Sequence, residues 1–169
     1  IEENPDNLTD FIGPPLWESF VVYYNFTKED AEKAVEIYRE RFAPIGVFEN
    51  KVLDGVPELL DSLKKQGKIL AVASSKPEVF VKKITDKFNL TKYFTAIVGS
   101  ELDGRRMDKA EVIKEAFKRL NITEESKSKT IMVGDRCHDV IGAKKCKIKC
   151  VGVEFGYAKP DELKDAGAE

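Results

Sequence analysis

The sequence predicts an α/β fold in which a parallel sheet is covered by helices on both faces, a doubly wound arrangement. From residue 52 onward, short apolar runs alternate with segments of helical periodicity, as they do in βαβ units. The apolar runs are continuous rather than alternating, as expected of strands buried on both faces. With 169 residues, 42% of them hydrophobic, the chain is long enough for one core and a small added unit.

The first part of the chain, residues 1–48, is helical in pattern and lacks this alternation. Large apolar side chains recur four residues apart from Leu16 to Tyr24, which places them on one face of a helix. Thr27 is typical of the N-cap of a second helix, and Pro44 marks its end. We therefore expect a small helical domain here, separate from the α/β core.

The remainder, residues 49–169, forms the expected core. Helices are predicted where apolar residues recur every three or four positions, and strands where short apolar runs stand alone. Gly67 ends the first of these helices, Pro77 suits the first turn of the second, and Asp108 caps the third. In chain order we expect helices at residues 56–66, 77–88, 108–120, 139–145 and 160–166, and strands at residues 69–73, 96–98, 130–133 and 150–153.

Composition narrows the class of protein. The formal net charge is −2, so there is no electrostatic reason to expect nucleic acid as a partner, and the lysines near residue 145 are expected to form a solvated face. No apolar run approaches the roughly 20 residues that span a bilayer. Three cysteines without CxxC spacing favour reduced thiols and a cytoplasmic location. His138 is the single histidine, which excludes a multi-histidine metal site.

The segment Gly134-Asp135-Arg136-Cys137-His138-Asp139 carries the strongest chemical signal. Asp135 follows a buried strand directly, and Asp139 comes four residues later at the start of a helix. Open α/β sheets bind ligands at the carboxyl ends of their strands. Two carboxylates there suit a hard cation such as Mg²⁺, which could neutralise a phosphate. Alternatively, Asp139 only stabilises the N-terminus of its helix.

Two further groups stand at the expected sheet edge. Ser74 and Ser75 follow the first strand, where hydroxyls and backbone N–H groups can hold a phosphate. The alternative is that they only cap the helix that Pro77 opens. Lys109 opens the helix after Asp108, a position that the helix dipole mildly disfavours for a cation. It is therefore either a functional lysine or an ordinary solvated one.

The order of these segments resembles that of the haloacid dehalogenase (HAD) superfamily. The strings Val72-Ala73-Ser74-Ser75-Lys76-Pro77, Arg106-Met107-Asp108-Lys109 and Val133-Gly134-Asp135-Arg136-Cys137-His138-Asp139 look like its second, third and fourth motifs. The segments Phe11-Ile12-Gly13-Pro14-Pro15-Leu16 and Asp54-Gly55-Val56 resemble the phosphoglycolate phosphatase-like branch, which has a helical cap near its N-terminus. The resemblance implies a HAD-like, Rossmannoid core with a partial cap.

The resemblance also implies a role for each matching position. Ser74 and the N–H of Ser75 would bind the transferring phosphoryl group, and Lys109 would balance its charge. Asp135 would bind Mg²⁺, and Asp139 would support that metal site. Gly13 would lie on the cap side, where the leaving group is recognised. The implied activity is Mg²⁺-dependent hydrolysis of a small phosphorylated metabolite, such as a phosphoglycolate-, nucleotide- or sugar-phosphate-like ester, through an aspartyl-phosphate.

One motif of the resemblance is missing. The first motif, Asp-x-Asp-Gly-Thr, would supply the nucleophile and the general acid and base, and Asp54-Gly55 matches it in letters only. Its strand is the central one of the implied fold, so a gap is expected between the strands at residues 69–73 and 130–133. We expect that strand to come from residues outside this sequence. The alternatives are a phosphomutase of the β-phosphoglucomutase type and a non-catalytic module that binds a phosphate or a partner.

Overall fold

A computed structural model describes residues 8 and 11–169, and the helical pattern expected over the remaining residues of 1–10 lies outside the described part. The N-terminal unit is a pair of helices, α1 (Leu16–Tyr24) and α2 (Lys28–Phe42), followed by the 3₁₀ turn η2 (Gly46–Phe48). Thr27 caps α2 by accepting a hydrogen bond from the backbone N–H of Asp30 at 3.1 Å. Both predicted helices of this unit are therefore confirmed.

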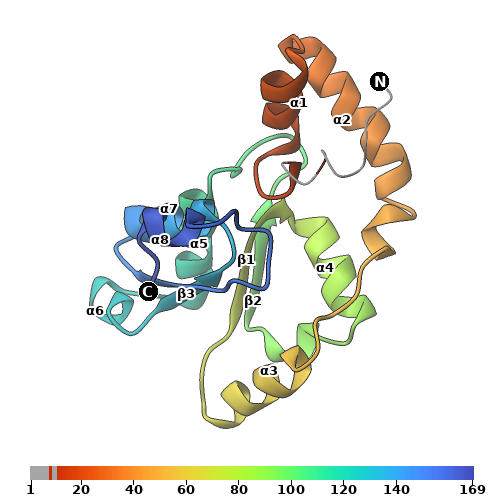
Figure 1. The fold of residues 1–169 in the computed structure, drawn as a ribbon. Coiled ribbons are helices and arrows are strands. Elements are labelled where there is room, and N and C mark those ends of the chain that lie inside the picture. The colour runs from red at the N-terminus through yellow and green to blue at the C-terminus, as the bar shows by residue number, and fades with distance from the viewer. Residues whose placement is uncertain (1–7, 9–10) are drawn as a thin grey trace.

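The rest of the chain alternates between helices and strands as predicted (Figure 1). The four-residue helix α6 (Glu124–Lys127) was not predicted because it is too short to show a periodic pattern. In chain order the elements are α3 (Val56–Lys65), β1 (Ala71–Pro77), α4 (Glu78–Lys87), η3 (Thr91–Tyr93), β2 (Ala96–Ser100), α5 (Lys109–Leu120), α6 (Glu124–Lys127), β3 (Ile131–Gly134), α7 (Cys137–Lys145), β4 (Lys149–Gly152) and α8 (Glu162–Ala166).

The strands form two separate parallel pairs. β1 pairs with β2, placing Ala73 opposite Val98, and β3 pairs with β4, placing Val133 opposite Val151. Among the described residues, β1 and β3 each have a strand on one side only. The expected gap between these two strands is therefore present, and each strand has an edge whose backbone groups no described strand satisfies.

The helices cover the two pairs of strands unequally. α4 and α5 pack on opposite faces of the β1–β2 pair (Figure 1). α7 packs on the β3–β4 pair, where Met132 contacts the buried core around Val140 and Ala143. On the other face of β3, the side chains of Ile131 and Val133 are 58% and 59% exposed. Among the elements that the structure describes, helices cover both faces of the β1–β2 pair but only one face of the β3–β4 pair.

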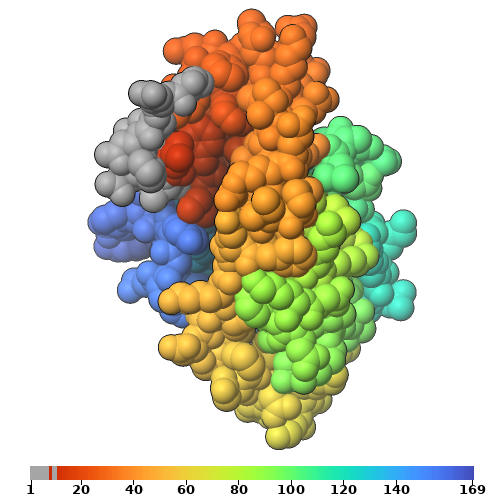
Figure 2. Space-filling view, turned by 90° about the vertical axis from the view of Figure 1, so that its right-hand side faces the viewer, coloured from red at the N-terminus to blue at the C-terminus, as the bar shows by residue number. Residues whose placement is uncertain are grey.

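The helical cap lies beside the carboxyl ends of the strands. In Figure 2, α2 runs down the face of the molecule and meets α4, where the rings of Phe42 and Phe80 pack edge to face at 5.2 Å. The Arg39 guanidinium donates a hydrogen bond to the Leu102 carbonyl at 2.9 Å. These contacts close the cap over the edge of the sheet where the predicted site residues lie.

Candidate active site

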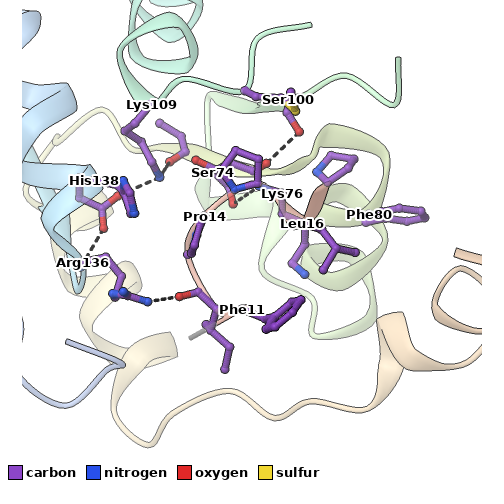
Figure 3. Close-up of a pocket in the computed structure, with 18 of the residues that line it drawn as sticks. Phe11, Pro14, Leu16, Ser74, Lys76, Phe80, Ser100, Lys109, Arg136 and His138 are labelled. Carbon is purple, nitrogen blue, oxygen red and sulfur yellow. Dashed lines mark hydrogen bonds and ion pairs between the residues drawn. The ribbon is translucent and has the colours of Figure 1, made fainter. Parts of the chain in front are cut away.

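A cavity of about 630 Å³ lies between the cap and the carboxyl ends of β1 and β3. Its core wall includes all the site residues predicted on the core, which are Ser74, Ser75, Lys109, Asp135 and Asp139. Figure 3 shows Ser74, Lys109 and His138 on this side. Its cap wall includes Phe11, Pro14 and Leu16. The structure thus gathers segments that are far apart in sequence around one hollow.

Asp139 occupies a space that a glycine leaves open. A Cβ on Gly134 would overlap the Asp139 side chain, so a larger residue at the end of β3 would displace it. Asp139 is 6% exposed. One of its oxygens lies 2.8 Å from the Lys109 ammonium, and the other accepts a hydrogen bond from the backbone N–H of Arg136 at 3.2 Å. The carboxylate is therefore buried, paired and fixed in orientation.

Lys109 is not a solvated surface lysine. Its side chain is 12% exposed, and besides Asp139 its ammonium donates a hydrogen bond to the Ala73 carbonyl at 3.1 Å. Gly142 of α7 makes room for it, because a Cβ there would lie 2.5 Å from the lysine Cγ. The ammonium consequently joins β1 to the first turn of α7.

A second glycine allows Asp135 to contact a distant loop. The backbone N–H of Tyr157 donates a hydrogen bond to the Asp135 carboxylate at 2.9 Å, and a Cβ on Gly156 would overlap that carboxylate. This contact from the segment between β4 and α8 was not predicted. The only local signal was a glycine between two aromatic residues, Phe155 and Tyr157.

Ser74 and Ser75 do not cap α4, the alternative considered for them. The N-cap of that helix is Pro77, and no side chain caps it. The serines lie instead where the register between β1 and β2 shifts. The Ser74 hydroxyl accepts a hydrogen bond from the backbone N–H of Lys76 at 3.2 Å, and the Ser75 carbonyl accepts one from Ser100 at 2.8 Å. Both serines line the cavity.

Gly13 lines the cavity too, and its backbone has a φ of +119°. A Cβ there would lie 2.8 Å from an Arg136 guanidinium nitrogen. That guanidinium donates to the Ile12 carbonyl and forms an ion pair with Glu162 at 2.8 Å. Gly13 therefore permits a contact between the cap and the loop of Asp135, a structural role that sequence reasoning did not foresee.

Glu162 of α8 holds that loop from the other side. It accepts hydrogen bonds from the backbone N–H groups of Cys137 and Lys159, at 2.8 and 3.1 Å, in addition to its ion pair with Arg136. Burial alone would raise the pKa of Glu162, but these donors together lower it to about 2. The carboxylate is therefore charged at neutral pH, and it fixes the start of α7.

The acidic residues offer an incomplete metal site. No group of three or more His, Cys, Asp and Glu side chains that could hold a metal occurs within the described part of the chain. Mg²⁺ commonly binds to one or two carboxylates and completes its shell with water and substrate phosphate. Asp135 fits that use as a hard oxygen donor at a strand end, whereas the two oxygens of Asp139 already have protein partners.

Comparison with known proteins identifies the class. The family model described as haloacid dehalogenase-like hydrolase matches residues 2–153. The chain therefore belongs to the haloacid dehalogenase-like hydrolases. The crystal structure of a predicted phosphatase from Clostridium acetobutylicum superposes with a TM-score of 0.93 and 49% identity, over 99% of this chain and 76% of that one.

The similar curated proteins carry several names. A 5'-nucleotidase from Pseudomonas aeruginosa is 43% identical over 164 residues, which cover 96% of this chain and 73% of that protein. The tyrosine-protein kinase PtkA from Mycobacterium tuberculosis is 36% identical over 92% of this chain and 52% of its own length. A phosphoglycolate phosphatase from Aquifex aeolicus is 32% identical over 94% of this chain and 72% of its length. These relatives support the phosphoglycolate phosphatase-like branch.

No helix among the described residues is long and apolar enough to cross a membrane. All three cysteines are free thiols, as the sequence predicted. The basic stretch is engaged in local contacts: Lys145 pairs with Asp108 at 2.8 Å, and Lys149 pairs with Glu169 at 2.9 Å. The side chains of Lys145 and Lys149 are 55% and 65% exposed, which agrees with the expectation of a solvated face.

Proposed function

We propose that this protein is a Mg²⁺-dependent phosphatase that hydrolyses a small phosphate monoester through an aspartyl-phosphate. Membership of the family, together with relatives named as phosphatases, makes it a phosphoric monoester hydrolase. The observation on which the finer proposal rests is the buried ammonium of Lys109, which contacts both the Ala73 carbonyl of β1 and the Asp139 carboxylate. Phosphoryl transfer depends on such positioned charge more than on covalent chemistry.

The proposed roles follow from these contacts. Ser74 and the N–H of Ser75 would bind the phosphoryl oxygens at the end of β1, and Lys109 would balance their charge. Asp139 is a positioning residue for Lys109, because its carboxylate already has that ammonium and a backbone N–H as partners. Asp135 would hold Mg²⁺, oriented by the N–H of Tyr157. The bound ion would neutralise charge on the phosphoryl group.

The nucleophile is proposed to come from a strand that inserts between β1 and β3. Both strands have an edge without a partner among the described residues, and their carboxyl ends meet at the cavity. An extended segment that paired with both would satisfy these edges and would end beside Ser74 and Asp135. An aspartate at that end would attack phosphorus, displace the ester oxygen and later be released by water.

Candidate substrates come from the relatives. A nucleoside 5'-monophosphate and 2-phosphoglycolate are the first esters to test, followed by sugar phosphates. The three cysteines are free thiols, which supports a cytoplasmic site of action. Small phosphorylated metabolites are the expected partners there.

A phosphate-release screen across these esters tests the proposal. We expect the full natural chain to release inorganic phosphate in the presence of Mg²⁺. Phosphate release should cease when EDTA removes the ion and should resume when Mg²⁺ is added back. A sugar-phosphate isomer without free phosphate would instead favour the phosphomutase. Binding of phosphate esters with no turnover of any kind would favour the non-catalytic module.

A further inference from the structure

Arg136 joins the cap to the loop that carries Asp135. It follows Asp135 directly in the sequence, and its guanidinium donates a hydrogen bond to the Ile12 carbonyl of the cap (Figure 3). Gly13, the next residue of the cap, has a φ of +119°, a conformation that L side chains rarely adopt. A Cβ there would lie 2.8 Å from a guanidinium nitrogen. The cap is therefore suited to this contact both in backbone conformation and in the space that it leaves.

The same guanidinium is fixed on the core side. Its Nε lies 2.8 Å from the Glu162 carboxylate, and both side chains are 12% exposed. Glu162 also accepts a hydrogen bond from the Cys137 N–H at 2.8 Å, and Asp139 accepts one from the backbone N–H of Arg136 at 3.2 Å. Because a guanidinium is planar and rigid, the nitrogen that contacts the cap moves together with the loop of Asp135.

Other contacts between the cap and the core involve different parts of the core. Arg39 of α2 donates to the Leu102 carbonyl at 2.9 Å, in the loop that follows β2. The Trp17 indole N–H of α1 donates to the Met107 sulfur at 3.3 Å, in the segment before α5. Neither contact involves the loop of Asp135. The position of the cap can therefore be changed by substitutions that leave this loop intact.

Entry of a ligand into the cavity requires the cap to move, because the cap and the core both line it. Polar contacts between two parts of one chain commonly permit such relative motion. When the cap opens, the Ile12 carbonyl leaves Arg136, whereas Glu162 stays with the core. The loop of Asp135 is therefore held by more contacts when the cap is closed than when it is open.

We propose that Arg136 couples closure of the cap to binding of Mg²⁺ at Asp135. It is a positioning residue, because it acts through the loop that carries the metal ligand. Closure fixes this loop and strengthens Mg²⁺ binding, and by thermodynamic reciprocity Mg²⁺ favours the closed cap by the same factor. The inference rests on the proposed function and its metal site, and it adds that changes in the cap alter the affinity for Mg²⁺.

Trp17 reports closure, since it is the single tryptophan of the sequence and contacts the core through Met107. In the full natural chain, Mg²⁺ alone should change the fluorescence of Trp17, with a midpoint equal to the Kd from calorimetric titration. Subtracting the signal of Trp17→Phe assigns the change to this residue. Arg136→Met should bind Mg²⁺ without the fluorescence change. Arg136→Lys, which keeps the charge but lacks the planar fork, should lose most of the change.

A double-mutant cycle tests the coupling through affinity. Arg39→Met loosens the cap at a contact away from Asp135 and should raise the Kd for Mg²⁺ about fivefold, at the lower end of typical coupling between sites. Loss of a cation from the cavity would by itself strengthen Mg²⁺ binding, so the two causes have opposite signs. In Arg136→Met the same substitution should change the Kd less than about twofold. Arg41→Met, which removes an exposed arginine of α2 that pairs with Glu49, is the matched control and should leave the Kd unchanged.

The outcomes separate the coupling from the proposed function. Mg²⁺ binding that leaves the Trp17 signal unchanged, or equal effects of Arg39→Met with and without Arg136, would overturn the coupling alone. Coupled changes without phosphate release from any ester would sustain the coupling and overturn the phosphatase. Absence of Mg²⁺ binding would overturn both the coupling and the metal site.

Discussion

Lys109 and Asp139 show how one buried pair can serve both stability and chemistry. The pair is nearly inaccessible, with side chains 12% and 9% exposed, and two glycines provide the space for it. Removing one member of a buried ion pair leaves the other charge buried without a partner. The free-energy cost of that charge exceeds the stabilisation that the intact pair provides. A substitution here should consequently change stability as well as turnover, and the two effects can be separated.

Lys109→Met should lower the free energy of unfolding by about 3–5 kcal/mol, because it leaves Asp139 buried and unpaired. It should also lower turnover by orders of magnitude if the ammonium balances charge in the transition state. Urea unfolding and phosphate release measure the two effects. Adding Asp139→Asn should restore part of the stability but not the turnover. Lys114→Met, on the exposed face of α5, is the control, and a loss of turnover below about twofold in Lys109→Met would contradict the assigned role.

Gly156 is a second residue whose lack of a side chain matters. Its φ is not in the left-handed region, so alanine would be unfavourable through contact with Asp135 and not through backbone strain. Gly156→Ala should cost about 1–3 kcal/mol of stability, as overpacking does, and should weaken Mg²⁺ binding by displacing the carboxylate. Calorimetric Mg²⁺ titration and thermal unfolding test both effects. Phe155→Ala, whose side chain is 71% exposed, should change neither; unchanged Mg²⁺ affinity in Gly156→Ala would remove Asp135 from the metal site.

At the scale of elements, a charge network joins α4, α5 and the loop that follows β2. Glu78 at the start of α4 lies 2.9 Å from Arg119 of α5 and 2.7 Å from Lys82. Arg106, in the loop before Lys109, lies 3.2 Å from Glu101 and donates to the Gly99 carbonyl at 2.9 Å. The network therefore fixes the segment from which the Lys109 helix begins.

The network predicts a dependence of stability on pH. Burial alone would raise the pKa of Glu78, but hydrogen bonds from Arg119 and Lys82 outweigh it and lower the pKa from 4.5 to about 2. Between pH 4.5 and pH 2 the unfolded chain therefore binds more protons than the folded chain. The stabilisation is complete above pH 4.5 and is lost as the pH falls toward 2, with a slope of at most about 1.4 kcal/mol per pH unit for one proton.

Glu78→Gln should flatten the pH dependence of the unfolding free energy between pH 4.5 and 2, as measured by urea unfolding at a series of pH values. Glu162, whose pKa is also lowered to about 2, contributes a slope of the same sign, so some dependence should remain. Glu58→Gln, on the exposed surface of α3, controls for the loss of one carboxylate. If the unfolding free energy of Glu78→Gln depended on pH as steeply as that of the wild type, the ion pairs of Glu78 would add no net stability.

At the scale of the whole molecule, the gap between the two pairs of strands is the dominant feature. Two strand edges and the apolar face formed by Ile131 and Val133 are uncovered by any described element. Exposed strand edges are templates for pairing with another chain. A protein made of residues 1–169 alone should therefore bind a hydrophobic dye and self-associate in sedimentation experiments, whereas the full natural chain should do neither.

Val133→Lys should reduce this association, because a charge on the open face of β3 opposes edge pairing. Val22→Lys, which replaces another exposed valine (68%) on α1, controls for the change in charge and should leave the association unchanged. A segment that is monomeric and binds no dye would contradict the proposed insertion of a strand between β1 and β3.

Much of the fold and the positions of the core site residues could be predicted from sequence. The predicted strands and most of the predicted helices occur within a few residues of their expected bounds, because hydrophobic periodicity and caps are local signals. The extent of β1 differs most: the expected strand at residues 69–73 is found at Ala71–Pro77, since an irregular pairing after Ala73 carries Ser74 and Ser75 into the strand. Contacts of Arg136 with the cap, and of Tyr157 with Asp135, left no local pattern to predict them.

The sequence by itself determined which residues stand at the carboxyl ends of the strands, because strand order and motif spacing are properties of the chain. Only the tertiary structure decided their partners: that Asp139 pairs with Lys109, that Asp135 accepts a hydrogen bond from the N–H of Tyr157, and that Lys76 forms no ion pair with a described residue. The first two of these contacts join residues that are 30 and 22 positions apart in the sequence. They depend on how helices pack on the sheet, which the spacing of motifs does not specify.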